Sequence, residues 1–267
     1  MTTRVWRVFV FEFRKVIRWK YLYVSFAIAL IGCGLASVVP EVLSGEWDAE
    51  SNGYTLFAII SHYATFPVAS LLCVVFAALL VGQEYTHGTI APFAATPVRR
   101  YEMLLGKTLL ALCYNVVIIG IVFSFGFILA YFLQGFETIQ IDKHRSITLL
   151  SFLGDMSVAA IATVLPLLAV SSVVMAITLV TENAGFSIGI ALSAGVILPL
   201  LRFFQLDFER VSVIEFVGRP TSLLVEIGEE IQVEWLYELR MLGIVSGVTL
   251  AAGLAFMFVL FSCKKIV

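Results

Sequence analysis

Charged residues are scarce in this chain. Asp, Glu, Lys and Arg make up 13% of its 267 residues, whereas 60% are hydrophobic. Soluble domains contain about 25% charged and roughly 45–50% apolar residues. An apolar excess of this size cannot be buried in one soluble core. The composition therefore excludes an ordinary soluble protein and favours a membrane protein.

Six runs of the sequence contain almost no charge and are long enough to cross a membrane. A helix needs roughly 20 apolar residues to span a bilayer core about 30 Å thick. No run alternates polar and apolar residues as the strands of a membrane barrel do. We therefore predict an all-α membrane protein with six transmembrane helices in a single domain, residues 1–267. The predicted spans are residues 21–39, 56–81, 108–133, 156–180, 184–203 and 241–262.

The motifs of several reactive sites are also missing. The four cysteines form no C-x-x-C pair, no H-E-x-x-H occurs, and His62, His87 and His144 fall on different predicted loops and faces. No metal site is expected. No charged residue stands in the middle of a span, where a proton relay would require one. An intramembrane enzyme is therefore disfavoured, and an ion-coupled secondary transporter remains the alternative to the function inferred below.

A phosphate-binding loop of the pattern G-x-x-x-x-G-K-[ST] is absent as well. Gly106-Lys107-Thr108 matches the end of this pattern, but Tyr101 stands where the first glycine is required. We therefore expect the chain to bind no cofactor directly and to be no enzyme by itself. Any ATP hydrolysis has to come from a separate subunit.

Lys and Arg are distributed unevenly over the predicted loops. With the N-terminus inside, eleven of the 17 lie on the cytoplasmic side and six lie outside, in agreement with the positive-inside rule. Fifteen of the 19 Asp and Glu then lie outside. Six spans return the C-terminus to the cytoplasm. The expected location is the bacterial plasma (inner) membrane, with a multi-pass topology and both termini cytoplasmic.

Residues 1–20 are predicted to form an amphipathic interfacial helix. At 100° per residue, their basic side chains gather on one stripe while apolar and aromatic side chains cover the other side. Each basic residue near anionic lipid adds about 1 kcal/mol of binding free energy. The pattern fits equally well an anchor that only orients the first span. The basic stripe consists of Arg4, Arg7, Arg14, Lys15 and Arg18.

A long external loop, residues 205–240, is predicted before the last span. Residues 222–238 have an apolar stripe at helical spacing, and Pro220 with the following hydroxyl residues gives a helix-start signal. Residues 211–217 are apolar enough to pair with this helix. The loop is therefore predicted to hold an external helical hairpin.

The predicted cytoplasmic loop, residues 83–103, differs in composition from the rest of the chain. A short helix over residues 89–96, entered at Gly88 and ended before Pro97, would project from the membrane and fit a cleft on a soluble partner. Glu84 is a candidate for a buried ion pair with Arg99, Arg100 or a basic residue of the N-terminal helix. The alternative interpretation is an ordinary solvated loop with inside-positive arginines.

This loop resembles that of the ABC-2 type permease family. Members often have an E-x-x-x-G-T element after the second helix, then a proline and a basic residue, and then G-K at the start of the third. Together with six spans, an amphipathic N-terminal helix and a long external loop, the resemblance covers nearly the whole chain. The matching residues here are Glu84, Gly88, Thr89, Pro97, Arg99 or Arg100, and Gly106-Lys107.

The resemblance implies one half of an exporter. In this family two six-helix permease protomers, identical or related, enclose a pathway, and two ABC ATPase subunits dock on their inner loops and bind ATP and Mg. The first cytoplasmic loop carries the coupling helix, and the N-terminal helix helps relay the closure of the ATPases. Expected substrates are hydrophobic or amphipathic: a lipid, an antimicrobial peptide or a drug.

The partners implied are therefore the ABC ATPase subunit, a second permease protomer and membrane lipids, with no nucleic acid. The ATPase-coupling residues implied are Glu84, Tyr85, Gly88, Thr89, Pro97, Arg99, Arg100 and Lys107.

Overall fold

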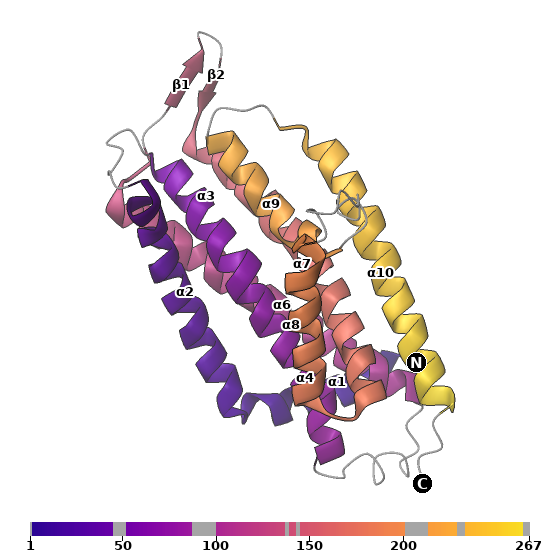
Figure 1. The fold of residues 1–267 in the computed structure, drawn as a ribbon. Coiled ribbons are helices and arrows are strands. Elements are labelled where there is room, and N and C mark those ends of the chain that lie inside the picture. Colours follow the sequence, from indigo (N-terminus) through magenta and orange to yellow (C-terminus); the bar gives the residue numbers. More distant parts are fainter. Residues whose placement is uncertain are drawn as a thin grey trace.

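Long helices standing side by side form most of the computed structural model (Figure 1). It describes residues 2–44, 52–86, 100–136, 139–142, 145–200, 213–228 and 233–263. Helix α1 covers Thr2–Ile17, and the longer helices are α2 (Lys20–Ser44), α6 (Arg100–Leu133), α7 (Leu149–Thr181) and α10 (Trp235–Cys263). The shorter ones are α3 (Gly53–Tyr63), α4 (Ser70–Thr86), α8 (Ala184–Leu200) and α9 (Val213–Gly228).

Five helical segments of the described chain are long and apolar enough to cross a membrane. They match the first four predicted spans and the sixth, which confirms a helical multi-pass membrane protein. The segments are Lys20–Val38, Gly53–Thr86, Tyr101–Leu133, Leu149–Thr181 and Trp235–Leu260.

The fifth predicted span, residues 184–203, corresponds to the shorter helix α8. In the described part of the chain α8 has 17 residues. At about 1.5 Å per residue this is roughly 26 Å, less than a bilayer core of about 30 Å. The count of six spans is therefore not confirmed.

The second span is one helix with a π-helical turn in its middle, η1 (Ala64–Ala69), between α3 and α4. Pro67 lies in this turn and has no backbone N–H to donate. The Ser70 backbone N–H reaches back to the Thr65 carbonyl, and the Ser70 hydroxyl donates to the Phe66 carbonyl instead. The side chain of Ser70 thus adds a hydrogen bond to a carbonyl of this irregular turn.

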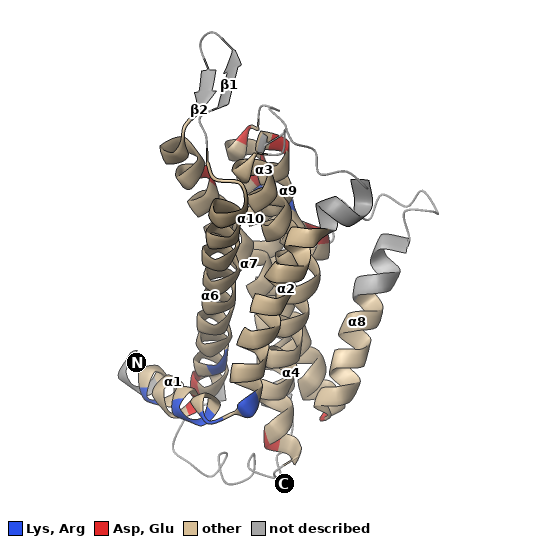
Figure 2. Cartoon of the chain, turned by 90° about the vertical axis from the view of Figure 1, so that its left-hand side faces the viewer, with Lys and Arg blue, Asp and Glu red and all other residues tan. Residues whose placement is uncertain are grey.

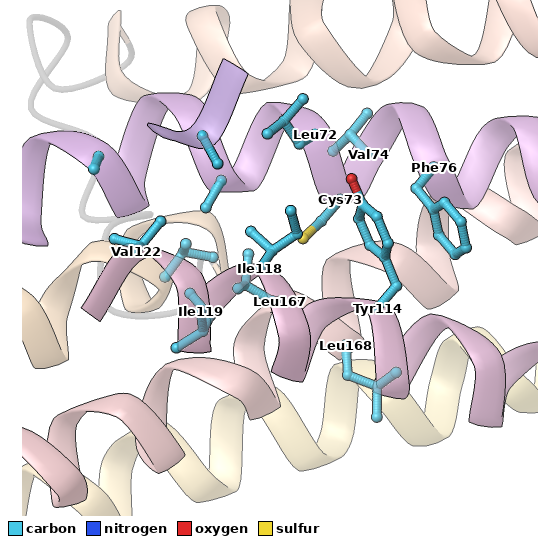
Figure 3. Close-up of a cluster of buried hydrophobic side chains, with 14 of the residues drawn as sticks. Leu72, Cys73, Val74, Phe76, Tyr114, Ile118, Ile119, Val122, Leu167 and Leu168 are labelled. Carbon is cyan, nitrogen blue, oxygen red and sulfur yellow. The ribbon is translucent and has the colours of Figure 1, made fainter. Parts of the chain in front are cut away.

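Helix α7 is the central helix of the bundle and packs against α4, α6, α8, α9 and α10. Where α4, α6 and α7 meet, buried side chains such as Cys73, Ile118 and Leu167 fill the core (Figure 3). The rings of Phe76 and Tyr114 stack there with centroids 3.9 Å apart. This packing fixes the position of α6 relative to α4.

The predicted helical hairpin in residues 205–240 is wrong in its boundaries. Helix α9 runs from Val213 to Gly228 and passes through Pro220, and α10 already begins at Trp235. Helix α9 packs against α3 and α7 (Figure 1). A Cβ atom at Gly218 would lie 3.0 Å from the Phe66 ring, so the missing side chain permits this close approach. Tertiary packing here overrides the helix-start signal of the proline.

The link between the third and fourth spans contains a short antiparallel hairpin that the sequence did not predict. Strands β1 (Ile139–Asp142) and β2 (Arg145–Ile147) pair with Ile139 opposite Ile147. The hairpin lies at the end of the bundle away from α1 (Figure 1).

Candidate functional site

Helix α1 lies across one end of the bundle and packs against α6 (Figure 2). Its buried apolar side chains are Val8, Phe9 and Val16, while the predicted basic residues Arg7, Arg14 and Arg18 are exposed. The amphipathic division of this helix is therefore present in the structure. Figure 2 shows the Lys and Arg of α1 grouped at this end of the molecule.

Helix α1 approaches α6 closely at Gly106. A Cβ atom at this position would lie 2.7 Å from Cγ1 of Val8 and 3.4 Å from the backbone nitrogen of Phe9. Real Cβ contacts are longer than the first of these distances. The absence of a side chain at Gly106 therefore allows α1 and α6 to pack closely. Lys107 is the next residue of α6 and lies beside this contact.

Among the described residues, four charged side chains meet beneath α1. Lys107 Nζ of α6 lies 2.7 Å from Glu84 Oε1 of α4 and 3.3 Å from Glu12 Oε1 of α1. It also donates to the Leu80 carbonyl at 3.1 Å. Lys15 Nζ of α1 lies 3.5 Å from Glu84 Oε1 and 3.9 Å from Glu12 Oε2. We call Glu12, Lys15, Glu84 and Lys107 the charge cluster.

The charge cluster is buried but electrically balanced. Lys107 and Glu84 are each 3% exposed and Glu12 is 1% exposed, whereas Lys15 is 29% exposed at the rim. Two carboxylates face two ammonium groups, so the formal charges sum to zero. Transfer of unpaired ions into such a site costs several kcal/mol each, and removal of one partner of a buried pair destabilises by about 3–5 kcal/mol. The three helices are thus held together at one point.

This arrangement joins the helix before residues 87–99 to the helix after them. Glu84 lies two residues before the end of α4, and Lys107 is the eighth residue of α6. Glu12 and Lys15 connect both to α1. A family model described as ABC-2 family transporter protein matches residues 8–197. The chain belongs to the ABC-2 transporter family.

Membership of this family makes the protein an ABC permease. It is a multi-pass membrane protein of a family that associates with ABC ATPase subunits. A comparison with the curated proteins finds no match. The matched residues include α4, α6 and the part of α1 from Val8 onward, and therefore the whole charge cluster of this ABC-2 permease.

The structure brings together three of the predicted site residues of the permease, Lys15, Glu84 and Lys107. The predicted ion pair between Glu84 and a basic residue of the N-terminal helix is confirmed by its contact with Lys15. Tyr85 is half-buried and packs against the hydrophobic core.

The side chains of the other predicted coupling residues lie outside the described part of the structure. Gly88, Thr89, Pro97 and Arg99 fall in residues 87–99, which the described ranges do not include. Arg100 begins α6, and only its backbone is described. The same holds for Arg4 in α1. The roles of the five loop residues in ATPase coupling stay predictions, as does the place of Arg4 on the basic stripe.

Sequence reasoning missed Glu12. It is the one acidic residue of α1 and lies three positions before Lys15, on the same face of the helix. The sequence did contain a signal for it, namely a single acidic residue among the basic residues of the predicted interfacial helix. Among the described residues, no group of three or more His, Cys, Asp or Glu side chains is placed to hold a metal ion.

Proposed function

We propose that this ABC-2 permease is the membrane subunit of an exporter of hydrophobic or amphipathic molecules, driven by ATP that a separate ABC ATPase subunit hydrolyses. The observation that carries the proposal is the charge cluster, which ties both helices next to residues 87–99 to α1. In this proposal the ATPase binds residues 87–99 and moves the three helix ends together.

Separation of buried charges costs free energy. If α4 moved without α6, the 2.7 Å contact between Glu84 and Lys107 would open inside the protein. Lys15 and Glu12 would stay near the two ions, but each ion would lose this contact without gaining water, and burial of an ion that is less well paired costs free energy. The ends of α1, α4 and α6 should therefore move as one rigid body, as packed elements do in shear and hinge motions.

We further propose two permease protomers and two ATPase subunits in the complex, with both termini of each permease in the cytoplasm of a bacterial cell. ATP and Mg bind to the ATPase subunits, and the permease is no enzyme by itself. The 18-residue windows in α2 and α10 are only 22% buried in the protomer. Their apolar outer surfaces are available to lipid and to a second protomer.

The test is affinity purification of the full chain from its native membranes, followed by identification of copurifying ATPases. We expect an ABC ATPase with the unmodified chain and its loss from Gly88→Trp. The matched control is Gly120→Trp in α6, because Gly120 is exposed and a Cβ atom there would meet no atom within 4 Å. Equal recovery of the ATPase with both variants would contradict docking at residues 87–99.

Transport into inverted membrane vesicles separates this function from ion-coupled transport. We expect ATP-dependent uptake of the hydrophobic or amphipathic substrate, and we expect it to continue when the proton gradient is collapsed. Uptake that requires the gradient and proceeds with an ATPase unable to hydrolyse ATP would instead support the alternative, a secondary transporter.

A further inference from the structure

Helix α1 of the permease has an inner face that carries two members of the charge cluster. Val8 and Val16 are buried on this face, and Glu12 and Lys15 lie with them. Glu12 reaches Lys107 of α6 at 3.3 Å. The charge cluster is therefore complete only while the inner face of α1 rests on the bundle.

A second face of α1 is apolar and exposed. Trp6, Phe13 and Ile17 lie on it and are 59%, 42% and 40% exposed. Phe9 at its border stacks on both rings, with its centroid 5.1 Å from that of Trp6 and 5.8 Å from that of Phe13. Contact of such a surface with water costs free energy in proportion to its area. On interfacial helices, tryptophan and phenylalanine lie at the boundary between lipid headgroups and acyl chains.

The third face of α1 is basic. Arg7, Arg14 and Arg18 are exposed, and their spacings of seven and four positions place them on one side of the helix. None of the three forms an ion pair or a side-chain hydrogen bond in the described part of the structure. A guanidinium presents a planar fork of N–H donors that matches the oxygens of a phosphate group. This basic face is thus suited to phosphate groups.

Helix α1 lies at the level of the lipid headgroups. Residues 18 and 19 alone separate it from α2, where the first membrane span begins at Lys20. Gly106, on which α1 packs, is the sixth residue of the span Tyr101–Leu133. At about 1.5 Å per residue, α1 crosses that span within roughly 10 Å of its start. Interfacial helices bury their apolar faces to a similar depth, about 5–10 Å into the boundary of headgroups and acyl chains.

We propose that the basic face of α1 binds the phosphate groups of anionic lipids, while Trp6, Phe13 and Ile17 insert between the acyl chains. A bilayer offers both ligands at one level, which a free phosphate ion does not. The two faces are centred about 100° apart around the helix, so a soluble subunit bound to the arginines would leave the aromatic face in water. Cytoplasmic leaflets are rich in anionic lipid, and the proposed topology places α1 in this leaflet.

Anionic lipid should therefore regulate the charge cluster. A ligand that binds one state of an equilibrium stabilises that state. Lipid bound along α1 favours the state in which α1 rests on the bundle. Without it, α1 lifts more often and takes Glu12 and Lys15 away from Glu84 and Lys107. This regulation rests on the proposed function, because the charge cluster is the site proposed to move with the ATPase.

The first test measures how often α1 lifts from the bundle. A cysteine at Val16, which is 3% exposed, reacts with a polar maleimide only when the inner face opens. The full chain with Val16→Cys is placed in nanodiscs of phosphatidylcholine, alone or with an equal part of phosphatidylglycerol. We expect labelling to be at least fivefold slower with phosphatidylglycerol. The chain without this substitution gives the background from its own cysteines.

Three sets of variants, each in the Val16→Cys chain, assign the lipid effect to the basic face. Combined Arg7→Gln, Arg14→Gln and Arg18→Gln should make the labelling rates in the two lipids equal. The same three positions changed to lysine should keep most of the difference, because the charge is retained. Arg240→Gln is the matched control, since Arg240 is an exposed arginine of α10 on the predicted outer side; it should change nothing.

The second test measures bound lipid directly. Phosphatidylglycerol that stays with the purified full chain is quantified by mass spectrometry, and we expect the combined glutamine variant to retain at least threefold less of it than the Arg240→Gln variant. Each variant is first checked for an unchanged unfolding temperature in phosphatidylcholine. If the combined variant unfolds, Arg14→Gln alone decides the assignment and should lose part of both effects.

Two results would overturn the proposal. One is an equal lipid effect in the unmodified and the combined glutamine chains. The other is loss of a copurifying ATPase from the glutamine variant with its phosphatidylglycerol unchanged, which would assign the basic face to the ATPase. The labelling assay contains neither ATPase nor ATP. A lipid effect without a copurifying ATPase would therefore refute the exporter and keep the lipid site, whereas a copurifying ATPase without a lipid effect would refute only the lipid site.

Discussion

Lys107 and Glu84 approach to 2.7 Å, although residues 87–99 separate the helices that carry them. The contact is buried, and Glu12 of α1 joins it at 3.3 Å from Lys107. Both ends of the segment predicted to receive the ATPase are therefore fixed to each other and to α1. This relationship yields the first of four predictions.

Lys107→Met should destabilise the permease by about 3–5 kcal/mol, because it leaves the buried carboxylates of Glu12 and Glu84 with the rim residue Lys15 as their remaining cation in the cluster. Thermal unfolding in detergent measures the loss. Lys20→Met, at an exposed position, is the control and should change little. A Lys107→Met protein as stable as the control would show that the cluster contributes little.

Gly106→Ala should push α1 away from α6, since the new Cβ would lie 2.7 Å from Val8 Cγ1. Overpacking of this kind costs about 1–3 kcal/mol. The second substitution Val8→Ala removes the opposing methyl groups and should restore part of the unfolding temperature. Gly120→Ala in the same helix meets nothing within 4 Å; it should be neutral or slightly stabilising. No rescue by Val8→Ala would argue against this contact.

Gly82→Ala should loosen α8. A Cβ atom at Gly82 of α4 would lie 2.5 Å from the Ala184 Cβ and 2.9 Å from its backbone nitrogen and Cα, and backbone cannot move aside as a flexible side chain can. The unfolding temperature should fall, and a cysteine placed at Ser187, which is buried, should react faster with a small maleimide. An unchanged labelling rate would show that α8 does not depend on this contact.

Arg219 should couple α9 to α10 only weakly. Its side chain is 39% exposed and that of Glu238 is 22% exposed, and solvent screens such pairs to about 0.2–1 kcal/mol. A double-mutant cycle of Arg219→Gln and Glu238→Gln measures this coupling from unfolding free energies. A coupling well above this range would mean that the α9–α10 contact is far less accessible to water than its exposure indicates.

The sequence was sufficient for much of the helical architecture. The runs of α2, α6, α7 and α10 were found because lipid demands long stretches without charge and has no alternative donor or acceptor for the backbone. The basic stripe of α1 was found for a similar reason, since a helix at a membrane surface must divide its polar and apolar faces. These requirements are local and can be read along the chain.

Contacts between distant segments could not be read in this way. Helix α9 continues through Pro220 because Gly218 packs on Phe66, about 150 positions earlier in the chain, and the buried Thr221 meets His62 at 3.2 Å. The local signal of the proline favoured a helix start. Packing against α3 and α7 outweighed it.

The charge cluster likewise depends partly on local sequence and partly on contacts between distant segments. The sequence made Lys15 a candidate through the basic stripe of the N-terminal helix, and it made Glu84 and Lys107 candidates through their resemblance to the motifs of ABC-2 type permeases. Only the tertiary structure decided that they meet and that Glu12 joins them, because 95 positions separate Glu12 from Lys107. The physical reason is the bare surface of Gly106, which brings α1 close enough to α6 for these charges to pair.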